Sequence, residues 1–469
     1  MKFIANHITL FLFLGLLTWS PNVFSQGSNQ LTFEEFITIV KENHPMSHIS
    51  TLKGNEGEYL IKEAKGGFDP KLNGNLNQKY FDNKNYYSHL HAGLKIPTWF
   101  GITVQAGYNE NSGVRLNPED YTSNTGLWNA GLSIQLGNGL LIDERRAELR
   151  QAEIYANSTQ LERDLMLNQF LLDASVSYYD WFKAHNYHSI YKEAVANANE
   201  RFENVKGLSE FGDKPSIDTL KALIFLQERQ LNLEKTRLEL ANKRALLEVF
   251  LWQDGFIPLE LDTNVHPSNY EEFVASIPPL ISPAALDSIS TNHPEFLISQ
   301  NKVAISKIDY RLKREQLKPN IELKYNALST NENQTPFANY SMNNYNWGAT
   351  ISYPIFTRKE RAKVKLTALK LEQQEAKLEL KEAELAYKIQ SSFNLWSSTV
   401  NQYNIYRQSI LNYSNLLSSE VTLFQIGEGS MFLVNLRDQE LIDAKLKLVS
   451  ITVQNKLGEV WYNYARVKI

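Results

Sequence analysis

Cysteine is absent from this chain of 469 residues. Disulfides and thiolate chemistry are therefore excluded, and no cysteine is available to carry an N-terminal lipid. An excess of charge of one sign is also missing, since 48 basic residues stand against 52 acidic ones and the formal net charge is -4. A near-neutral chain gives no general reason to expect nucleic acid as a partner.

Long hydrophobic runs are scarce as well. After residue 25, no stretch reaches the ~18 uninterrupted apolar residues that a membrane-spanning helix needs, so we expect any membrane-crossing part to be a β-barrel. Residues 1–25 combine a basic start, an apolar run at 8–17 and small residues near the end, which predicts a secretory signal cut between Ser25 and Gln26. The alternative, a membrane anchor, would need a longer run than these roughly ten apolar residues.

Glycine and proline are both missing from residues 358–426. A stretch without helix breakers predicts one very long helix, which at ~1.5 Å per residue would extend about 100 Å. Its apolar residues step by threes and fours, as at Ile389, Phe393 and Trp396. This spacing predicts a seam that packs on other helices of similar length.

An internal duplication is the main feature that is present. The tripeptide Asn-His-Pro ends at Pro45 and again at Pro294, 249 residues later, and a following proline keeps the same offset from Pro70 to Pro319. Before the first tripeptide, Thr32 and Glu35 have the spacing of a capping box and predict a helix start. Two copies of one unit are therefore expected.

Later landmarks of the two copies shift relative to each other. Trp128 matches Trp347 at an offset of 219, so the first copy holds 30 more residues than the second between its proline and its tryptophan. Gly212 then matches Gly427 at an offset of 215. We expect each copy to form a helix, strands, a very long helix, a glycine turn and a returning helix. The expected parts are a signal at 1–25, a first repeat at 26–253, a connector at 254–281, a second repeat at 282–469, and returning helices at 217–250 and 432–464.

Apolar and polar residues alternate in several short stretches, which predicts β-strands. The stretches are 72–77, 89–96, 102–108, 127–136, 321–327 and 347–356. Such alternation is typical of barrel strands with lipid outside and water inside, although a half-buried sheet of a soluble protein would show it too. So few strands cannot enclose a lumen, and several chains would have to contribute. Aromatic residues expected at the membrane interfaces are Tyr80, Trp99, Trp128, Tyr340, Trp347 and Tyr353.

No constellation for catalysis is visible in the sequence. The nine histidines are scattered without metal-ligand spacing, and neither a phosphate-binding glycine loop nor a nucleophile elbow is present. We therefore predict no enzyme activity, no catalytic residue, no metal and no cofactor. His44 and His293 are better explained by helix termination at their neighbouring Asn and Pro.

Each long helix is followed by a glycine-containing turn before the returning helix begins. Glycine supplies the conformation that ends a helix, and a nearby Ser or Pro starts the next one. An ordinary hairpin turn is one interpretation; the other is a surface for a partner at the far tip of a long structure. The residues concerned are Gly212, Asp213, Pro215 and Ser216 in the first copy and Gly427, Glu428, Gly429 and Ser430 in the second.

In this order, and written twice, these features resemble the TolC family of outer-membrane efflux ducts. The resemblance rests on the duplicated Asn-His-Pro helix end, on Pro70 and Pro319, on the strand-to-helix passages at 136–142 and 354–357, and on the Gly-Glu-x-Ser turn at Gly427. It implies a mainly α fold with a β-barrel portion. Duplicated long-helix hairpins would form a trimeric periplasmic tunnel, continuous with a barrel shared in the outer membrane.

The resemblance also implies the function and the partners. A homotrimer in outer-membrane lipid, extending into the periplasm, would be the exit duct of a tripartite efflux or type I secretion system. Its tip turns would meet a periplasmic adaptor, and an inner-membrane pump would supply the energy. The alternative is a soluble periplasmic coiled-coil scaffold. The sequence does not identify the cargo.

Two departures from the family pattern leave alternatives open. The family often carries acidic residues six and nine places after the second tip glycine, where this chain has Leu433 and Leu436. The closed end would then be formed by leucine rings or by other acids, namely Asp218, Glu428 or Asp438. The 30 extra residues of the first copy are also unlike the family's two-strand pattern, and the sequence alone does not decide whether they add barrel strands.

Overall fold

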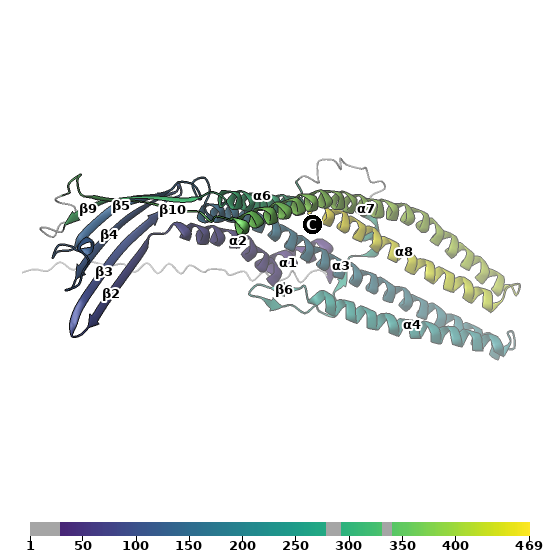
Figure 1. Cartoon of the computed structure of the whole chain (residues 1–469). Helices are drawn as coiled ribbons and strands as arrows, with labels where there is room; N and C mark the ends of the chain where they lie inside the picture. Colours follow the sequence, from purple (N-terminus) through teal and green to yellow (C-terminus); the bar gives the residue numbers. More distant parts are fainter. Residues whose placement is uncertain (1–28, 278–291, 331–339) are drawn as a thin grey trace, which may run out of the picture.

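The computed structural model describes residues 29–277, 292–330 and 340–469. The molecule is elongated, with a curled sheet at one end and two helical hairpins at the other (Figure 1). The predicted signal, with Ser25 and Gln26, lies outside the described residues, and so does the predicted start of the second repeat at 282. Within the described part, no helix offers an apolar stretch sufficient to span a lipid bilayer.

The short helices of both copies begin at well-defined residues. Helix α1 (Phe33–Asn43) starts at Thr32, whose hydroxyl accepts from the Glu35 amide while the Glu35 side chain accepts from the Thr32 amide. Proline is the first residue of α2 (Pro45–Lys65) and of α6 (Pro294–Glu315). The predicted capping box is confirmed, and the two proline starts are a feature that the structure adds.

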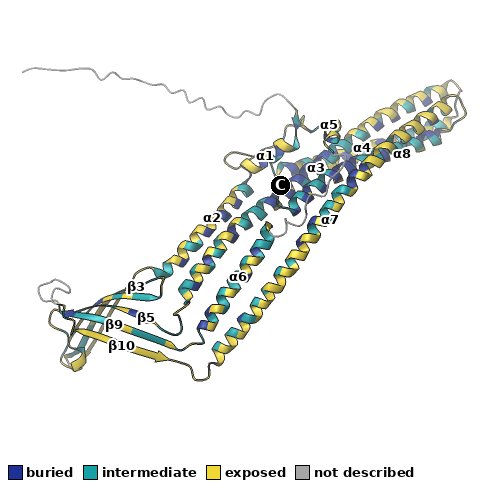
Figure 2. Ribbon diagram, turned by 90° about the horizontal axis from the view of Figure 1, so that it is seen from above, coloured by how far each residue is buried: buried dark blue, intermediate teal, exposed yellow. Residues whose placement is uncertain are grey.

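The two very long helices are also confirmed. Helix α3 (Glu144–Glu210) has 67 residues and α7 (Arg358–Gln425) has 68, so each extends about 100 Å. Helix α4 (Ser216–Glu248) returns along α3, and α8 (Met431–Ala465) returns along α7. Helices α2, α3, α6 and α7 lie side by side in that order between the sheet and the middle of the molecule (Figure 2).

The connector packs beside the long helices. It follows strand β6 (Trp252–Gln253) and contains the strands β7 (Ile257–Pro258) and β8 (His266–Pro267) and the helix α5 (Tyr270–Ala275). Strand β7 pairs with β6, and β8 pairs with β1 (Gln30–Leu31). Phe273 of α5 stacks on Phe182 of α3 with ring centroids 4.1 Å apart. This contact belongs to the largest apolar cluster, in which Tyr178 and Trp181 are fully buried.

All six predicted strand regions form one antiparallel sheet with the order β10-β9-β5-β4-β3-β2. The strands are β2 (Lys71–Phe81), β3 (Lys84–Pro97), β4 (Ile102–Ser112), β5 (Leu127–Gln135), β9 (Asn320–Thr330) and β10 (Tyr345–Ser352). Strand β9 starts 249 residues after β2, which is the offset of the duplicated prolines. Strand β5 carries Trp128 and β10 carries Trp347.

The extra residues of the first copy are therefore a β-hairpin. Strand β2 corresponds to β9 and β5 corresponds to β10, which leaves β3 and β4 without counterparts in the second copy. These two strands lie between β2 and β5 in the sheet and pair with both of them. The point that the sequence left open is settled: the insertion adds two strands to the sheet.

Candidate functional site

The two glycine turns share the backbone hydrogen bonds that end their long helices. Gly212 and Gly427 have φ values of +83° and +84°, in the left-handed region where glycine is favoured. The Asp213 amide donates to the Leu208 carbonyl at 2.9 Å, and the Glu428 amide donates to the Leu423 carbonyl at 3.0 Å. Each bond satisfies one of the last backbone carbonyl groups of a long helix, which have no partner within the helix itself.

The starts of the returning helices differ between the two turns. Ser430 caps α8, since its hydroxyl accepts from the Leu433 amide at 3.3 Å. Pro215 precedes α4 without any side-chain cap, and Ser216 is the first helical residue. The prediction that Ser or Pro starts the returning helix is thus confirmed in both turns, by Ser430 through its side-chain cap and by Pro215 and Ser216 without one.

The two turns form one surface at the end of the molecule. Lys214 Nζ lies 4.3 Å from the centre of the Phe424 ring, so the first turn contacts the end of α7. Behind them, Val205, Ala222 and Met431 form a buried apolar cluster that joins both hairpins. Most of the predicted tip residues are exposed, namely Gly212, Asp213, Pro215, Ser216, Gly427, Glu428 and Ser430, and Gly429 is half-buried.

The predicted closed-end residues have different surroundings. Leu433 is half-buried and Leu436 is 38% exposed in the single chain. Asp218 lies 3.2 Å from Lys221 on its own helix. Asp438 is turned into the helix packing, where Oδ1 lies 3.3 Å from Arg201 Nη2. Of the candidate acids, Asp218 and Asp438 thus both have a cationic partner in their own chain, and Asp438 is the buried one.

A buried arginine completes the cluster around Asp438. Arg229 of α4 is fully buried, and its Nη2 lies 3.6 Å from Asp438 Oδ2. Its Nη1 donates to Gln439 Oε1 at 2.5 Å. Together with Arg201 of α3, these residues connect three helices just behind the tip turns.

The sheet has one apolar face and one polar face. One row across five strands consists of Ile96, Val104, Leu132, Tyr325 and Trp347. The adjacent row, on the opposite face, consists of Lys95, Gln105, Gly131, Asn326 and Asn346. The apolar face is open to the surroundings in the single chain, with 66% exposure at Trp347 and 50% at Leu132.

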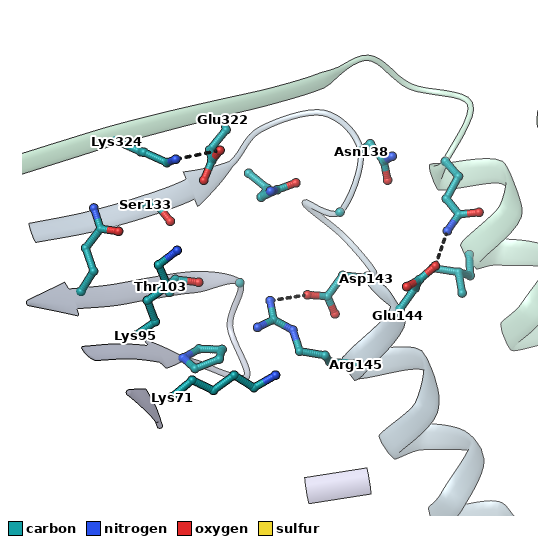
Figure 3. Close-up of a pocket in the computed structure, with 17 residues that line it drawn as sticks. Lys71, Lys95, Thr103, Ser133, Asn138, Asp143, Glu144, Arg145, Glu322 and Lys324 are labelled. Atoms are coloured by element: carbon teal, nitrogen blue, oxygen red, sulfur yellow. Dashed lines mark hydrogen bonds and ion pairs between the residues drawn. The ribbon is translucent and has the colours of Figure 1, made fainter. Parts of the chain in front are cut away.

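The polar face is hollowed near the helix starts (Figure 3). A hollow of about 510 Å³ opens there, lined on the sheet by Lys71, Lys95, Thr103, Ser133, Glu322 and Lys324. Lys324 lies 3.3 Å from Glu322, and Arg145 lies 3.2 Å from Asp143. Burial alone would raise the pKa of Asp143, but hydrogen bonds from the Arg146 amide and guanidinium hold that pKa below its usual range.

Two lysines give this hollow a positive excess. Lys71 on β2 and Lys95 on β3 are directly opposite each other in the sheet. Within the described part of the chain, no carboxylate lies within ion-pair distance of either one, whereas the other charged residues around the hollow have polar partners. Like charges at opposed positions weaken a sheet, so the pair is not explained by stability.

The histidines of the duplicated tripeptide are helix caps. Nδ1 of His44 accepts from the Met46 amide at 3.0 Å, and Nδ1 of His293 accepts from the Glu295 amide at 3.1 Å. The predicted helix end is confirmed in the first copy, where α1 ends at Asn43; in addition, each imidazole caps the start of the next helix, α2 or α6. Burial lowers the pKa of both histidines. Among the described residues, no group of three or more His, Asp or Glu could hold a metal ion.

Comparisons with known proteins find similar solved structures but no similar sequence. No family model and no curated protein matches the sequence. CusC, described in terms of folding and transmembrane channel formation, matches with a TM-score of 0.68 and 15% identity over 92% of this chain and 91% of that chain. The Campylobacter jejuni CmeC outer membrane channel matches with a TM-score of 0.64 and 14% sequence identity, over 93% of this chain and 85% of that chain. The open-state Neisseria gonorrhoeae MtrE outer membrane channel matches with a TM-score of 0.64 and 13% sequence identity, over 92% of this chain and 88% of that chain.

This chain has the TolC-family fold. The resemblance predicted from the sequence is confirmed at the level of the fold, including the long-helix hairpins next to a curled sheet. Sequence reasoning missed two features of this TolC-family fold: the capping role of His44 and His293, and the Arg229–Asp438 pair. The first could have been found from the His-Pro order, because a residue directly before a first-turn proline is an N-cap position.

Proposed function

We propose that the chain is the outer-membrane exit duct of a tripartite export system. Three copies would close a barrel in the lipid and continue as a helical tunnel across the periplasm, through which solutes pass without energy supplied by the duct. The observation that carries this proposal is the curled sheet, apolar on one face and hollowed and polar on the other, joined to helices about 100 Å long. The TolC-family fold supports the same function.

The tip surface supports the choice of partners. It lies at the end opposite the sheet, so it would be the first part met by a protein from the inner membrane (Figure 1). A periplasmic adaptor would dock on the turns at Gly212 and Gly427, and an inner-membrane pump would drive the transport. Efflux and type I secretion use such an arrangement equally, and the cargo is not defined by a wide duct.

The test is oligomeric state combined with conduction. Cross-linking in mild detergent should give a three-chain species that inserts into planar bilayers and conducts ions. A stable single chain that conducts would contradict the proposal. The alternative, a soluble periplasmic scaffold, predicts release of the protein from cells without detergent; the exposed apolar face of the sheet argues against it, because such a surface needs lipid or protein to cover it.

A further inference from the structure

We propose that the barrel has eighteen strands, six from each of three copies, and that β2 of one copy pairs with β10 of the next. The inserted hairpin β3–β4 is then part of the barrel wall in every copy. This inference rests on the trimer of the proposed function. It concerns the contact between copies and the width of the pore, which the fold alone does not define.

The two edges of the sheet fit each other. Strands β2 and β10 are the outer strands, and the backbone groups on their outer sides have no partner strand in the described part of the chain. Strand β2 leaves α2 and runs away from the helices, whereas β10 runs toward them and into α7. Edge strands of opposite direction pair antiparallel, which continues the alternation of the whole sheet. In lipid such edges must be paired, because no water satisfies their backbone groups.

The inserted hairpin has the residue pattern of the wall. On β3, Leu90 and Leu94 share the apolar face, while His91 and Lys95 share the polar face. On β4, Val104 lies on the apolar face. The hairpin is also paired along its length on both sides, to β2 and to β5, so a hairpin outside the wall would have to give up one of these ladders.

The circumference of the tunnel agrees with eighteen strands. Four helices in each copy lead into or out of strands, namely α2, α3, α6 and α7, so three copies place twelve helices around the tunnel. With axes ~8–10 Å apart, this ring measures about 100–120 Å around. Eighteen strands ~4.8 Å apart and tilted by ~40° measure about 110 Å, which lies within this range.

Disulfide trapping tests the contact, since the chain has no cysteine of its own. Asn75→Cys on the polar face of β2 is combined in turn with cysteine at each polar-face position of β10. The expected result is a covalent three-chain species, removed by reductant, for at least one pair. The matched control is Leu76→Cys with the same series, which should give none because its side chain points to the other face. The β10 positions are Asn346, Gly348, Thr350 and Ser352.

A second series tests the competing closure. If β2 and β3 stood outside the wall, β4 would meet β10 of the next copy, and Asn109→Cys would form the disulfides instead of Asn75→Cys. That result would overturn the eighteen-strand barrel while leaving the trimeric duct intact. Electron microscopy of the detergent-purified trimer gives an independent count: eighteen strands support the inference and twelve overturn it. A protein that forms no trimer at all would instead contradict the proposed function.

Discussion

Arg229 of α4 and Asp438 of α8 lie with Nη2 3.6 Å from Oδ2, and only 1% and 11% of their side chains are exposed. Asp438 also lies 3.3 Å from Arg201 of α3, so one carboxylate connects three helices behind the tip turns. Charges hidden from water are costly when they are unpaired, which makes this cluster sensitive to the loss of a single member.

We expect Asp438→Asn to destabilise the helical hairpins by about 3–5 kcal/mol, because two guanidinium groups lose their counter-charge and one of them is fully buried. A lower unfolding temperature by circular dichroism would show this. Replacing Arg229 and Asp438 together, with Arg229→Met and Asp438→Leu, should restore the part of the loss that comes from the fully buried Arg229, whereas Arg201, with 21% of its side chain exposed, keeps its unpaired charge. The surface pair of Lys445 and Glu193 gives the control: Glu193→Gln should cost less than ~1 kcal/mol.

The conformation of the tip turn should matter for export. We expect Gly427→Val to abolish export while leaving membrane insertion intact, because valine avoids the φ of +84° that ends α7. No atom lies within 4 Å of an added Cβ at Gly427 or Gly212, so only the backbone is tested. Gly427→Asn is the matched control, since asparagine tolerates the left-handed region and should retain export. Equal loss of membrane insertion in the valine variant would show that the turn is needed for assembly.

The closed end is predicted to be held by leucine. If Leu433 and Leu436 face the lumen, three copies bring apolar rings together, and such a constriction shuts a pore by dewetting. Replacing both with serine should raise the resting conductance, and the wild-type pore should show little block by divalent cations. Single-channel recording in planar bilayers decides the point. Strong block by a micromolar trivalent cation from the periplasmic side would mean that acids form the ring, with Glu428 as the first candidate, because Asp438 is buried between two arginines and Asp218 is paired with Lys221.

The histidine caps should make stability depend on pH. Burial lowers the pKa of His44 and His293, so below the usual value of ~6.5 the unfolded chain binds protons that the folded chain does not. The stabilisation is fully present above about pH 6.5 and is lost as the pH falls through the folded pKa values. Burial beside His266 and His188 lowers the pKa of His185 to about 4, which extends the same trend.

Asparagine at both caps separates capping from titration. His44→Asn with His293→Asn keeps an acceptor for each cap and removes the two titrating groups, so the loss of stability between pH 7 and pH 5 should become smaller. Thermal unfolding at several pH values measures this. An unchanged pH profile would mean that other groups, such as His185, are responsible.

The lysine pair in the hollow should favour anions. Three copies would place six uncompensated positive charges from Lys71 and Lys95 around the polar side of the barrel. We expect Lys71→Gln with Lys95→Gln to shift the reversal potential in a KCl gradient toward cation preference, most clearly at low salt where screening is weak. Lys84 lies at the other end of β3 from Lys95, so Lys84→Gln is the control and should shift the reversal potential less. An unchanged reversal potential would show that these charges do not act on the permeating ions.

The sequence predicted local and repeated features well, because each depends on neighbouring residues. Thr32 with Glu35 marked a helix start, and the matching positions of Gly212 and Gly427 located both turns. The Arg229–Asp438 pair was not predictable, since it depends on how α4 and α8, which are far apart in the sequence, face each other.

The order of the strands in the sheet was also not predictable from the sequence. The alternation within residues 89–96 and 102–108 was visible, but their position between β2 and β5 depends on pairing over long sequence distances. The tip residues and the closed end stay predictions, because a single chain does not show which side chains three copies bring together.

The inserted hairpin also bears on how such a duct could change during evolution. A hairpin adds one strand in each direction, so the chain comes back to the same end of the sheet and enters α3 with its direction unchanged. A single added strand would deliver the chain to the wrong end. In the proposed trimer, one short insertion in a single gene would therefore widen the barrel by two strands per chain and six in all, while leaving every helix sequence as it was.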